Sequence, residues 1–188
     1  MIKLDVNIAM EGKDQLERAR ERVIDVIAQN MDLYGVTDSI GRLYGMLMFQ
    51  EQPMTLDEMK EELGMSKTSM STSVRTLLEL KMVDKVWKKG VRKDLYKAES
   101  DWYQNFVDFF AIKWRAAISE NEYEMKKSLT ELNKLIDRED VEEEVKEMAK
   151  SDIEKLQYAL DYYDWLDRFV DSLESKEIFK LIPQKETE

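Results

Sequence analysis

The sequence contains neither cysteine nor histidine among its 188 residues. The absence of cysteine excludes disulfides, thiolate metal sites and cysteine nucleophiles, and it suits a reducing cytoplasm. The absence of histidine removes the commonest general base and the commonest metal ligand. Catalysis would therefore rest on carboxylates, Lys, Tyr or Ser alone. We expect a protein that is not an enzyme, with no catalytic residues, no cofactor and no metal site.

Glycine and proline are also scarce, with six and two residues respectively, whereas Glu, Lys, Leu and Met are abundant. This composition favours a mainly α-helical protein, and a hydrophobic content of 43% is enough to form a core. No uncharged apolar run approaches the ~20 residues that span a bilayer. Asp5 interrupts the apolar stretch that a secretory signal would need. The sequence therefore predicts a soluble protein of the cytoplasm, with no membrane partner.

One segment is charged against the rest of the chain, which carries a formal net charge of -11. Residues 66–97 contain nine Lys/Arg and three Asp/Glu, a net charge of +6, so the remaining residues sum to -17. The same region opens with six hydroxyl side chains within residues 65–73. A cationic segment in an acidic protein indicates an anionic partner.

The order of predicted elements around this segment is typical of a winged helix-turn-helix. Helices are predicted near residues 11–34, 37–52, 56–63 and 67–80. Thr55 and Glu58 have the spacing of a capping box, and Gly64 is a stop signal. Two short alternating runs, VDKVW and DLYKA, then predict a two-stranded hairpin with Gly90 at its turn.

The last of these helices has two distinct faces. Met70, Val74, Leu77 and Leu78 form an apolar stripe, and small hydroxyl side chains surround Arg75 on the opposite face. Such a face can approach base edges and phosphates, and the basic hairpin would reach phosphates beside it. A solvated Ser/Thr-rich face is the alternative. The predicted DNA-binding residues are Ser66, Lys67, Thr68, Ser69, Ser71, Thr72, Arg75, Lys88, Lys89, Arg92 and Lys93.

The second half of the chain differs in residue composition and pattern from the first half. An aromatic-rich helix is predicted after a cap at Ser100 or Asp101, followed by a second helix over about 122–139 and a third of about 30 residues that ends near Ser175. The acidic stretch 137–154 reads as a solvated helix face rather than a metal site. We therefore predict a mainly α fold with a small β-hairpin. It comprises a winged helix-turn-helix DNA-binding domain over 11–99 and a helical dimerisation and ligand-sensing region over 100–182.

Two runs of the sequence carry a family resemblance. They are residues 30–45, NMDLYGVTDSIGRLYG, and residues 53–106, PMTLDEMKEELGMSKTSMSTSVRTLLELKMVDKVWKKGVRKDLYKAESDWYQNF. These runs resemble the GbsR-type regulators of the MarR superfamily of winged-helix repressors. The resemblance covers about residues 11–182 and is most specific from Leu43 to Trp114. It implies a cytoplasmic homodimer that binds double-stranded operator DNA. It further implies repression of genes for choline uptake and glycine betaine synthesis.

The same resemblance implies an effector, choline or a related quaternary ammonium compound, that relieves repression. Such a cation has no N–H donor and is held mainly by the faces of aromatic rings. Two aromatic clusters at helical spacing are available, and core packing is the alternative for each single ring. The predicted ligand-binding residues are Tyr44, Tyr103, Phe106, Phe110, Trp114, Tyr158 and Tyr162. Two other functions stay open: a winged helix that binds protein, and a regulator that responds to a different ligand.

Overall fold

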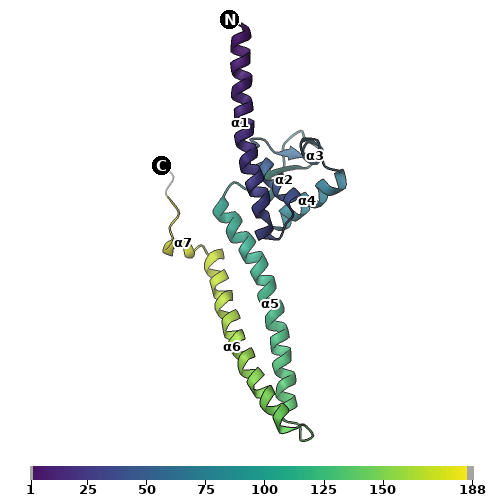
Figure 1. Cartoon of the computed structure of the whole chain (residues 1–188), viewed down its shortest axis with the longest axis vertical. Helices are drawn as coiled ribbons and strands as arrows, with labels where there is room; N and C mark the ends of the chain where they lie inside the picture. Colours follow the sequence, from purple (N-terminus) through teal and green to yellow (C-terminus); the bar gives the residue numbers. More distant parts are fainter. Residues whose placement is uncertain (1, 186–188) are drawn as a thin grey trace. The chain divides into compact units, whose positions relative to one another are not determined.

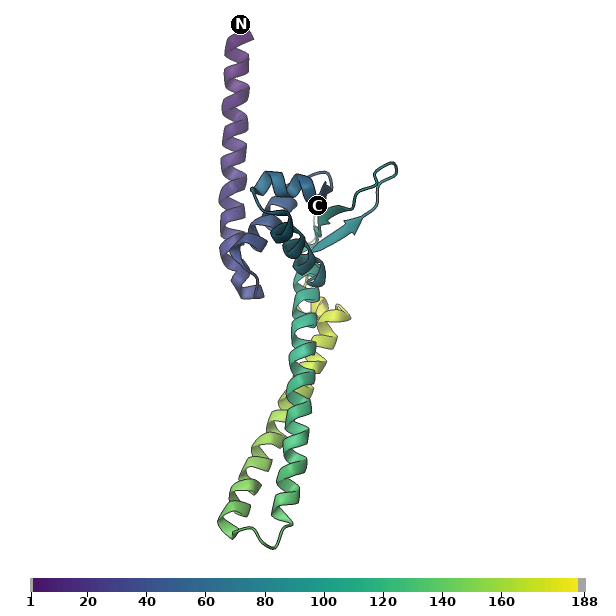
Figure 2. The same ribbon diagram turned by 90° about the vertical axis from the view of Figure 1, so that its right-hand side faces the viewer.

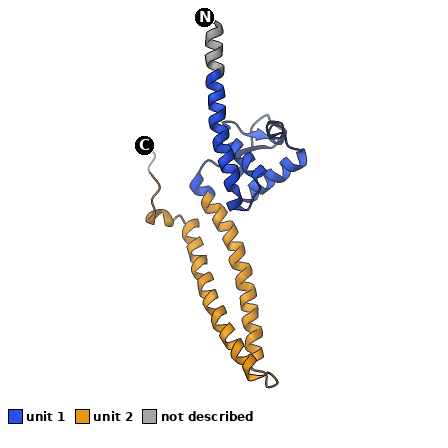
Figure 3. Ribbon diagram, in the orientation of Figure 1, with its two compact units in different colours: residues 1–105 blue, residues 106–188 orange. Residues whose placement is uncertain are grey.

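The computed structural model describes residues 2–185, with side chains described from residue 11 onward. In chain order the elements are α1 (Ile2–Asn30), η1 (Met31–Tyr34), α2 (Asp38–Met48), β1 (Met54–Thr55), α3 (Leu56–Leu63), α4 (Lys67–Glu79), β2 (Val83–Val86), β3 (Leu95–Ala98), α5 (Trp102–Ile136), α6 (Glu143–Glu174) and α7 (Ile178–Leu181) (Figure 1). The contacts divide the chain into two compact units (Figure 3). Unit 1 covers residues 1–105 and unit 2 covers residues 106–188. The predicted class, mainly helical with a small sheet, is confirmed.

The helix boundaries in unit 1 follow local signals that the sequence carries. Gly35 adopts a left-handed φ of 67° after η1, and Gly64 adopts a φ of 62° after α3. The capping box at the start of α3 is complete. The Thr55 backbone N–H donates to Glu58 Oε2 at 2.7 Å, and the Glu58 N–H donates to Thr55 Oγ1 at 3.3 Å. The bounds of α3 agree with those predicted from the sequence, whereas α1 begins before the predicted residue 11 and α2 ends at Met48, short of the predicted end near residue 52.

Close packing of α1 on α2 is possible because α2 has two glycines on the contact side. A Cβ atom on Gly41 would lie 2.7 Å from the Cα atom of Ala28, and one on Gly45 would lie 3.2 Å from the Cα atom of Ile24. Both distances are shorter than ordinary carbon–carbon contacts. The two backbones therefore approach each other more closely than side chains would allow at these positions.

The core of unit 1 holds the helix-turn-helix together. From α4, Met70, Val74 and Leu77 are buried, as the predicted apolar stripe requires, whereas Leu78 is only half-buried. They share this core with fully buried Met59 of α3 and Leu43 of α2, and α4 packs against both of these helices. Because one face of α4 is buried in this way, its opposite face is presented to solvent.

The sheet of unit 1 has three strands, not the two predicted. The strand order is β1-β3-β2, and both pairings are antiparallel. Met54 pairs with Tyr96 and Thr55 pairs with Leu95. A strand of two residues carries no period-2 pattern, so the sequence offered no signal for β1. The predicted hairpin itself is present, and its loop extends beyond the strands (Figure 2).

Unit 2 is a helical hairpin formed by α5 and α6, which lie side by side in both views (Figures 1 and 2). Its buried core contains Ala111, Ile118, Leu166 and Val170. The prediction of two helices between residues 101 and 139 was wrong, because α5 runs without a break over 35 residues. No glycine or proline interrupts this range, so nothing stops the helix before its end near Asp137. The long α6 was predicted correctly.

The described residues lack two features that would bear on function. None of the described helices is long and apolar enough to cross a bilayer. Within the same part of the chain, no group of three or more acidic side chains is arranged to hold a metal ion.

Candidate nucleic-acid interface and aromatic cluster

The outer face of α4 carries all the residues predicted there to contact DNA. Each of the seven side chains is exposed: Ser66, Lys67, Thr68, Ser69, Ser71, Thr72 and Arg75. Ser73, which the sequence analysis did not assign to DNA, is the hydroxyl residue of α4 that is buried. The helical spacing therefore places the predicted DNA-binding hydroxyl groups on the solvent-exposed face and the Ser73 hydroxyl in the core.

The start of α4 is capped by its own hydroxyl side chains. The Ser69 N–H donates to Ser66 Oγ at 3.1 Å, and the two serine hydroxyls lie 2.9 Å apart. A helix N-terminus carries a partial positive charge that favours a phosphate. Farther along the helix, Arg75 Nε lies 4.0 Å from Glu79 Oε1, and both side chains are well exposed. An exposed pair at this distance contributes little, so the Arg75 guanidinium is available to a ligand.

We define the wing as β2, β3 and the loop of residues 87–94 between them. Two of its lysines are engaged in ion pairs. Lys85 Nζ lies 2.8 Å from Asp94 Oδ2, and Lys93 Nζ lies 2.7 Å from Asp57 Oδ2 on α3. The hydrogen bond from Lys93 lowers the pKa of the Asp57 carboxyl, and the same contact raises the pKa of Lys93. These pairs neutralise the base of the wing and tie it to α3.

The wing loop keeps three cations without such partners. Within the described part of the chain, no carboxylate lies within 4.0 Å of Lys88, Lys89 or Arg92. All three side chains are exposed, and Gly90 between them has a φ of 87° that turns the loop. The positive charge of the wing is therefore concentrated at its loop, where an anionic partner would meet it first.

Tyr44, a predicted wall of the ligand site, lies in the core of unit 1 and is only 2% exposed. Its hydroxyl accepts a hydrogen bond of 2.8 Å from Asn105 Nδ2, which also donates to the Glu99 carbonyl at 3.2 Å. Burial raises the pKa of Tyr44 to about 12. This buried group links α2 to the segment that follows β3, and no local sequence pattern predicts the contact with Asn105.

In unit 2, aromatic rings contact one another in a continuous series. On α5 the ring centroids of Phe106 and Phe110 are 5.7 Å apart, and those of Phe110 and Trp114 are 5.6 Å apart. Phe110 meets Phe169 of α6 edge to face at 5.8 Å. Along α6 the series continues from Phe169 through Trp165 to Tyr162, with centroid distances of 5.8 and 6.2 Å.

The other predicted ligand residues lie differently. Tyr103 is about half exposed in the first turn of α5, and Tyr158 is 78% exposed on α6. The structure thus brings together Phe106, Phe110, Trp114 and Tyr162 through ring contacts. Trp165 and Phe169, which share their helical face with Tyr162, complete the series although they were not among the predicted site residues.

Near this series, one arginine forms ion pairs with three carboxylates. Arg115 of α5 contacts Asp167 and Asp171, and its Nη2 lies 2.6 Å from Glu174 Oε2. The three acidic residues follow α6 at spacings of four and three, so they share one helical face. The hydrogen bonds that Arg115 donates to Glu174 and Asp171 raise its pKa, so the guanidinium is charged at every relevant pH. The pairs tie α5 to α6.

Comparison with known proteins identifies the family. A model of the "GbsR family transcriptional regulator, C-terminal helical hairpin" matches residues 102–180. The chain is 44% identical to the HTH-type transcriptional repressor GbsR of Bacillus subtilis (strain 168), over 89% of this chain and 93% of that one. It is 40% identical to the repressor OpcR of the same organism, over 91% and 92% of the two chains. The chain belongs to the GbsR family of transcriptional regulators.

A solved structure shares this fold. A crystal structure titled as a transcriptional regulator superposes with a TM-score of 0.62 at 17% identity, covering 85% of this chain and 98% of that one. Membership confirms the predicted class of function, a DNA-binding transcriptional repressor, and it confirms that the protein is a regulator and not an enzyme. The assignments of individual DNA-binding and ligand-binding residues, the effector and the dimer stay predictions.

Proposed function

We propose that this GbsR-family chain is a dimeric repressor of genes for choline uptake and glycine betaine synthesis, acting in the cytoplasm. In this proposal, α4 and the wing bind a double-stranded operator, and choline or a related quaternary ammonium compound relieves repression. The observation that carries the DNA-binding part is the combination of an exposed hydroxyl face on α4 with three wing-loop cations that have no carboxylate partner in the described part of the chain.

Exposed apolar side chains on α1 support the dimer. Leu16, Val23 and Val26 are exposed on this helix. Burial of these apolar side chains against a second protein surface would be energetically favourable. A second copy of the chain is a suitable cover, because a single wing and recognition helix contact few base pairs. Two-fold symmetry then requires an operator with half-sites about one helical turn, or a small multiple of it, apart. Light scattering that finds a monomer at micromolar concentration would refute this arrangement.

The aromatic series supports a cationic effector. Trp165 and Tyr162 remain about half exposed at one end of the series, so part of each side chain is accessible to a ligand. Residues 106–188 include 22 Asp/Glu and 13 Lys/Arg, a net charge of -9, which attracts cations to unit 2. A quaternary ammonium can therefore gain from both the ring faces and the surrounding carboxylates.

The effector can act only through its different affinities for the DNA-binding and the DNA-free states. Gel-shift titration of promoter duplexes, with and without choline, tests both halves of the proposal. Trp114→Ala is expected to keep its affinity for DNA and to lose the response to choline. Tyr123→Ala, which removes an exposed ring of α5 outside the series, is the matched control. Calorimetry that finds unchanged choline binding in Trp114→Ala would place the ligand elsewhere.

A further inference from the structure

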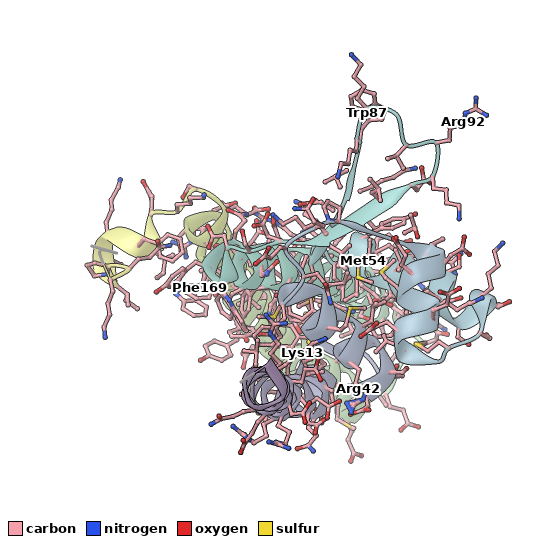
Figure 4. All side chains as sticks on the ribbon, turned by 90° about the horizontal axis from the view of Figure 1, so that it is seen from above. Lys13, Arg42, Met54, Trp87, Arg92 and Phe169 are labelled. Atoms are coloured by element: carbon pink, nitrogen blue, oxygen red, sulfur yellow. The ribbon has the colours of Figure 1, made fainter. Side chains whose placement is uncertain are left out.

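Trp87 is the least buried large hydrophobic side chain among those described, with 82% of its surface exposed. It is the first residue after β2, at the start of the wing loop. Figure 4 shows Trp87 and Arg92 on the projecting loop, with both side chains directed away from the rest of unit 1. An indole in this position contributes almost nothing to the core, so packing within the described chain does not account for it.

The surroundings of Trp87 indicate what it would bind. Lys88, Lys89 and Arg92 follow it within five positions and have no carboxylate within 4.0 Å in the described chain. Lys85 and Lys93, at the base of the wing, are neutralised by Asp94 and Asp57. The loop therefore presents one large apolar ring system next to three cations that no carboxylate of the described chain neutralises.

Duplex DNA has a surface that matches this pattern. Its phosphates alternate with apolar deoxyribose faces and the edges and faces of bases, and side chains that bind DNA use both kinds of surface. An anionic lipid surface also combines negative charge with an apolar layer. DNA is favoured, because the wing belongs to the same unit as the exposed hydroxyl face of α4 and the chain belongs to a family of transcriptional regulators.

We propose that Trp87 is a DNA-contacting residue of the wing. Its indole packs on deoxyribose and base edges of the operator, next to phosphates bound by Lys88, Lys89 and Arg92. The proposal rests on the DNA binding proposed above, and it adds an apolar contact to a surface described so far by charge and hydroxyl groups. It assigns affinity to a residue that carries no charge.

This assignment has a measurable signature, because charged and uncharged contacts respond differently to salt. Each phosphate contact made by Lys or Arg contributes about 0.9 to the slope of log K against log salt. An uncharged indole displaces no counterions from the phosphates when it binds, so its loss leaves the slope unchanged. Trp87→Ala should therefore weaken binding by a similar factor at every salt concentration, whereas Lys88→Ala should make the slope shallower by about one.

The test uses the full chain and a fluorescein-labelled duplex that the wild-type protein selects from a random-sequence pool. Binding is measured by anisotropy between about 50 and 200 mM salt. We expect Trp87→Ala to bind at least about fivefold more weakly with an unchanged slope, and Trp87→Phe to recover part of the loss. Trp102→Ala removes an exposed indole outside the wing and should bind like the wild type. Duplex should also change the tryptophan emission of the wild type more than that of Trp87→Phe.

Several results would overturn the proposal. If Trp87→Ala and the wild type bind with equal affinity, and the emission changes of the wild type and Trp87→Phe are equal, then Trp87 does not contact the DNA. A slope that falls together with affinity in Trp87→Ala would show that the indole only holds the loop cations in place. Intact DNA binding combined with lost binding to phosphatidylserine vesicles would assign the ring to a membrane. A wild-type protein that selects no duplex would instead refute the proposed DNA binding itself.

Discussion

Gly41→Ala offers a quantitative test of the packing of α1 on α2. The added methyl group would lie 2.7 Å from the Cα atom and 3.0 Å from the carbonyl oxygen of Ala28. Carbon atoms in favourable contact are about 3.5–4.0 Å apart, so α1 would have to move by about 1 Å. Backbone atoms of a helix cannot make way as a flexible side chain can. Overpacking of this kind costs about 1–3 kcal/mol.

The helix propensity of alanine partly offsets this cost. Alanine exceeds glycine by about 1 kcal/mol in a helix interior, so the net loss of unfolding free energy in Gly41→Ala is about 0–2 kcal/mol. Gly12 of α1 supplies the control, because a Cβ atom there would have no neighbour within 4 Å. Gly12→Ala should therefore gain up to about 1 kcal/mol. The two variants make the same chemical change and should shift stability in opposite directions.

Urea unfolding followed by circular dichroism gives the free energies, and thermal unfolding gives the midpoints. Both variants and the wild type must be compared at one protein concentration, because a dimer gains stability with concentration. For a chain of this length, 1 kcal/mol corresponds to a shift of about 2–4 °C in Tm. If Gly41→Ala proves as stable as Gly12→Ala, then α1 does not approach α2 as closely as described.

Three further changes test other contacts. Glu58→Gln should lower the free energy of unfolding at pH values above 4.5, the ordinary pKa of this carboxyl, because hydrogen bonds from Thr55 lower the pKa of Glu58 in the folded protein. The difference in unfolding free energy between the variant and the wild type should shrink as the pH falls below that value. Asn105→Ala should destabilise the protein by about 1–3 kcal/mol, measured by urea unfolding, because the buried Tyr44 hydroxyl loses its donor. Arg75→Ala should weaken binding of the selected operator by about 1–3 kcal/mol in anisotropy titrations and leave unrelated duplexes little affected; equal losses on both duplexes would remove Arg75 from base readout.

Local signals account for the parts of the fold that the sequence predicted well. The capping box at Thr55 and the stop at Gly64 act within one helical turn, so each can be predicted from neighbouring residues. The exposed face of α4 followed from the same short-range periodicity. Strand β1 could not be predicted, because its two residues become a strand only by pairing with β3, about 40 positions away in the sequence.

The candidate sites show the same division between local and long-range information. The ring series on α5 follows from helical spacing alone, but the contact of Phe110 with Phe169 depends on how α5 and α6 pack. Tyr44 was predicted to bind the ligand, and the residues next to it in the sequence do not indicate its tertiary partner. Its contact with Asn105 spans 61 positions. Trp87 could have been singled out from the sequence, since a tryptophan next to two lysines at a predicted turn is poorly placed for a core.

The cluster around Arg115 has an uneven tolerance of mutation. Any one of Asp167, Asp171 and Glu174 could be lost and the guanidinium would keep two anionic partners. Loss of the arginine would leave three negative charges along one face of α6 without the cation that they share. Sequence drift in this part of the hairpin should therefore spread among the acidic positions and spare the single basic one. Exchanging the charges of one pair would not restore the cluster, because every carboxylate shares the same partner.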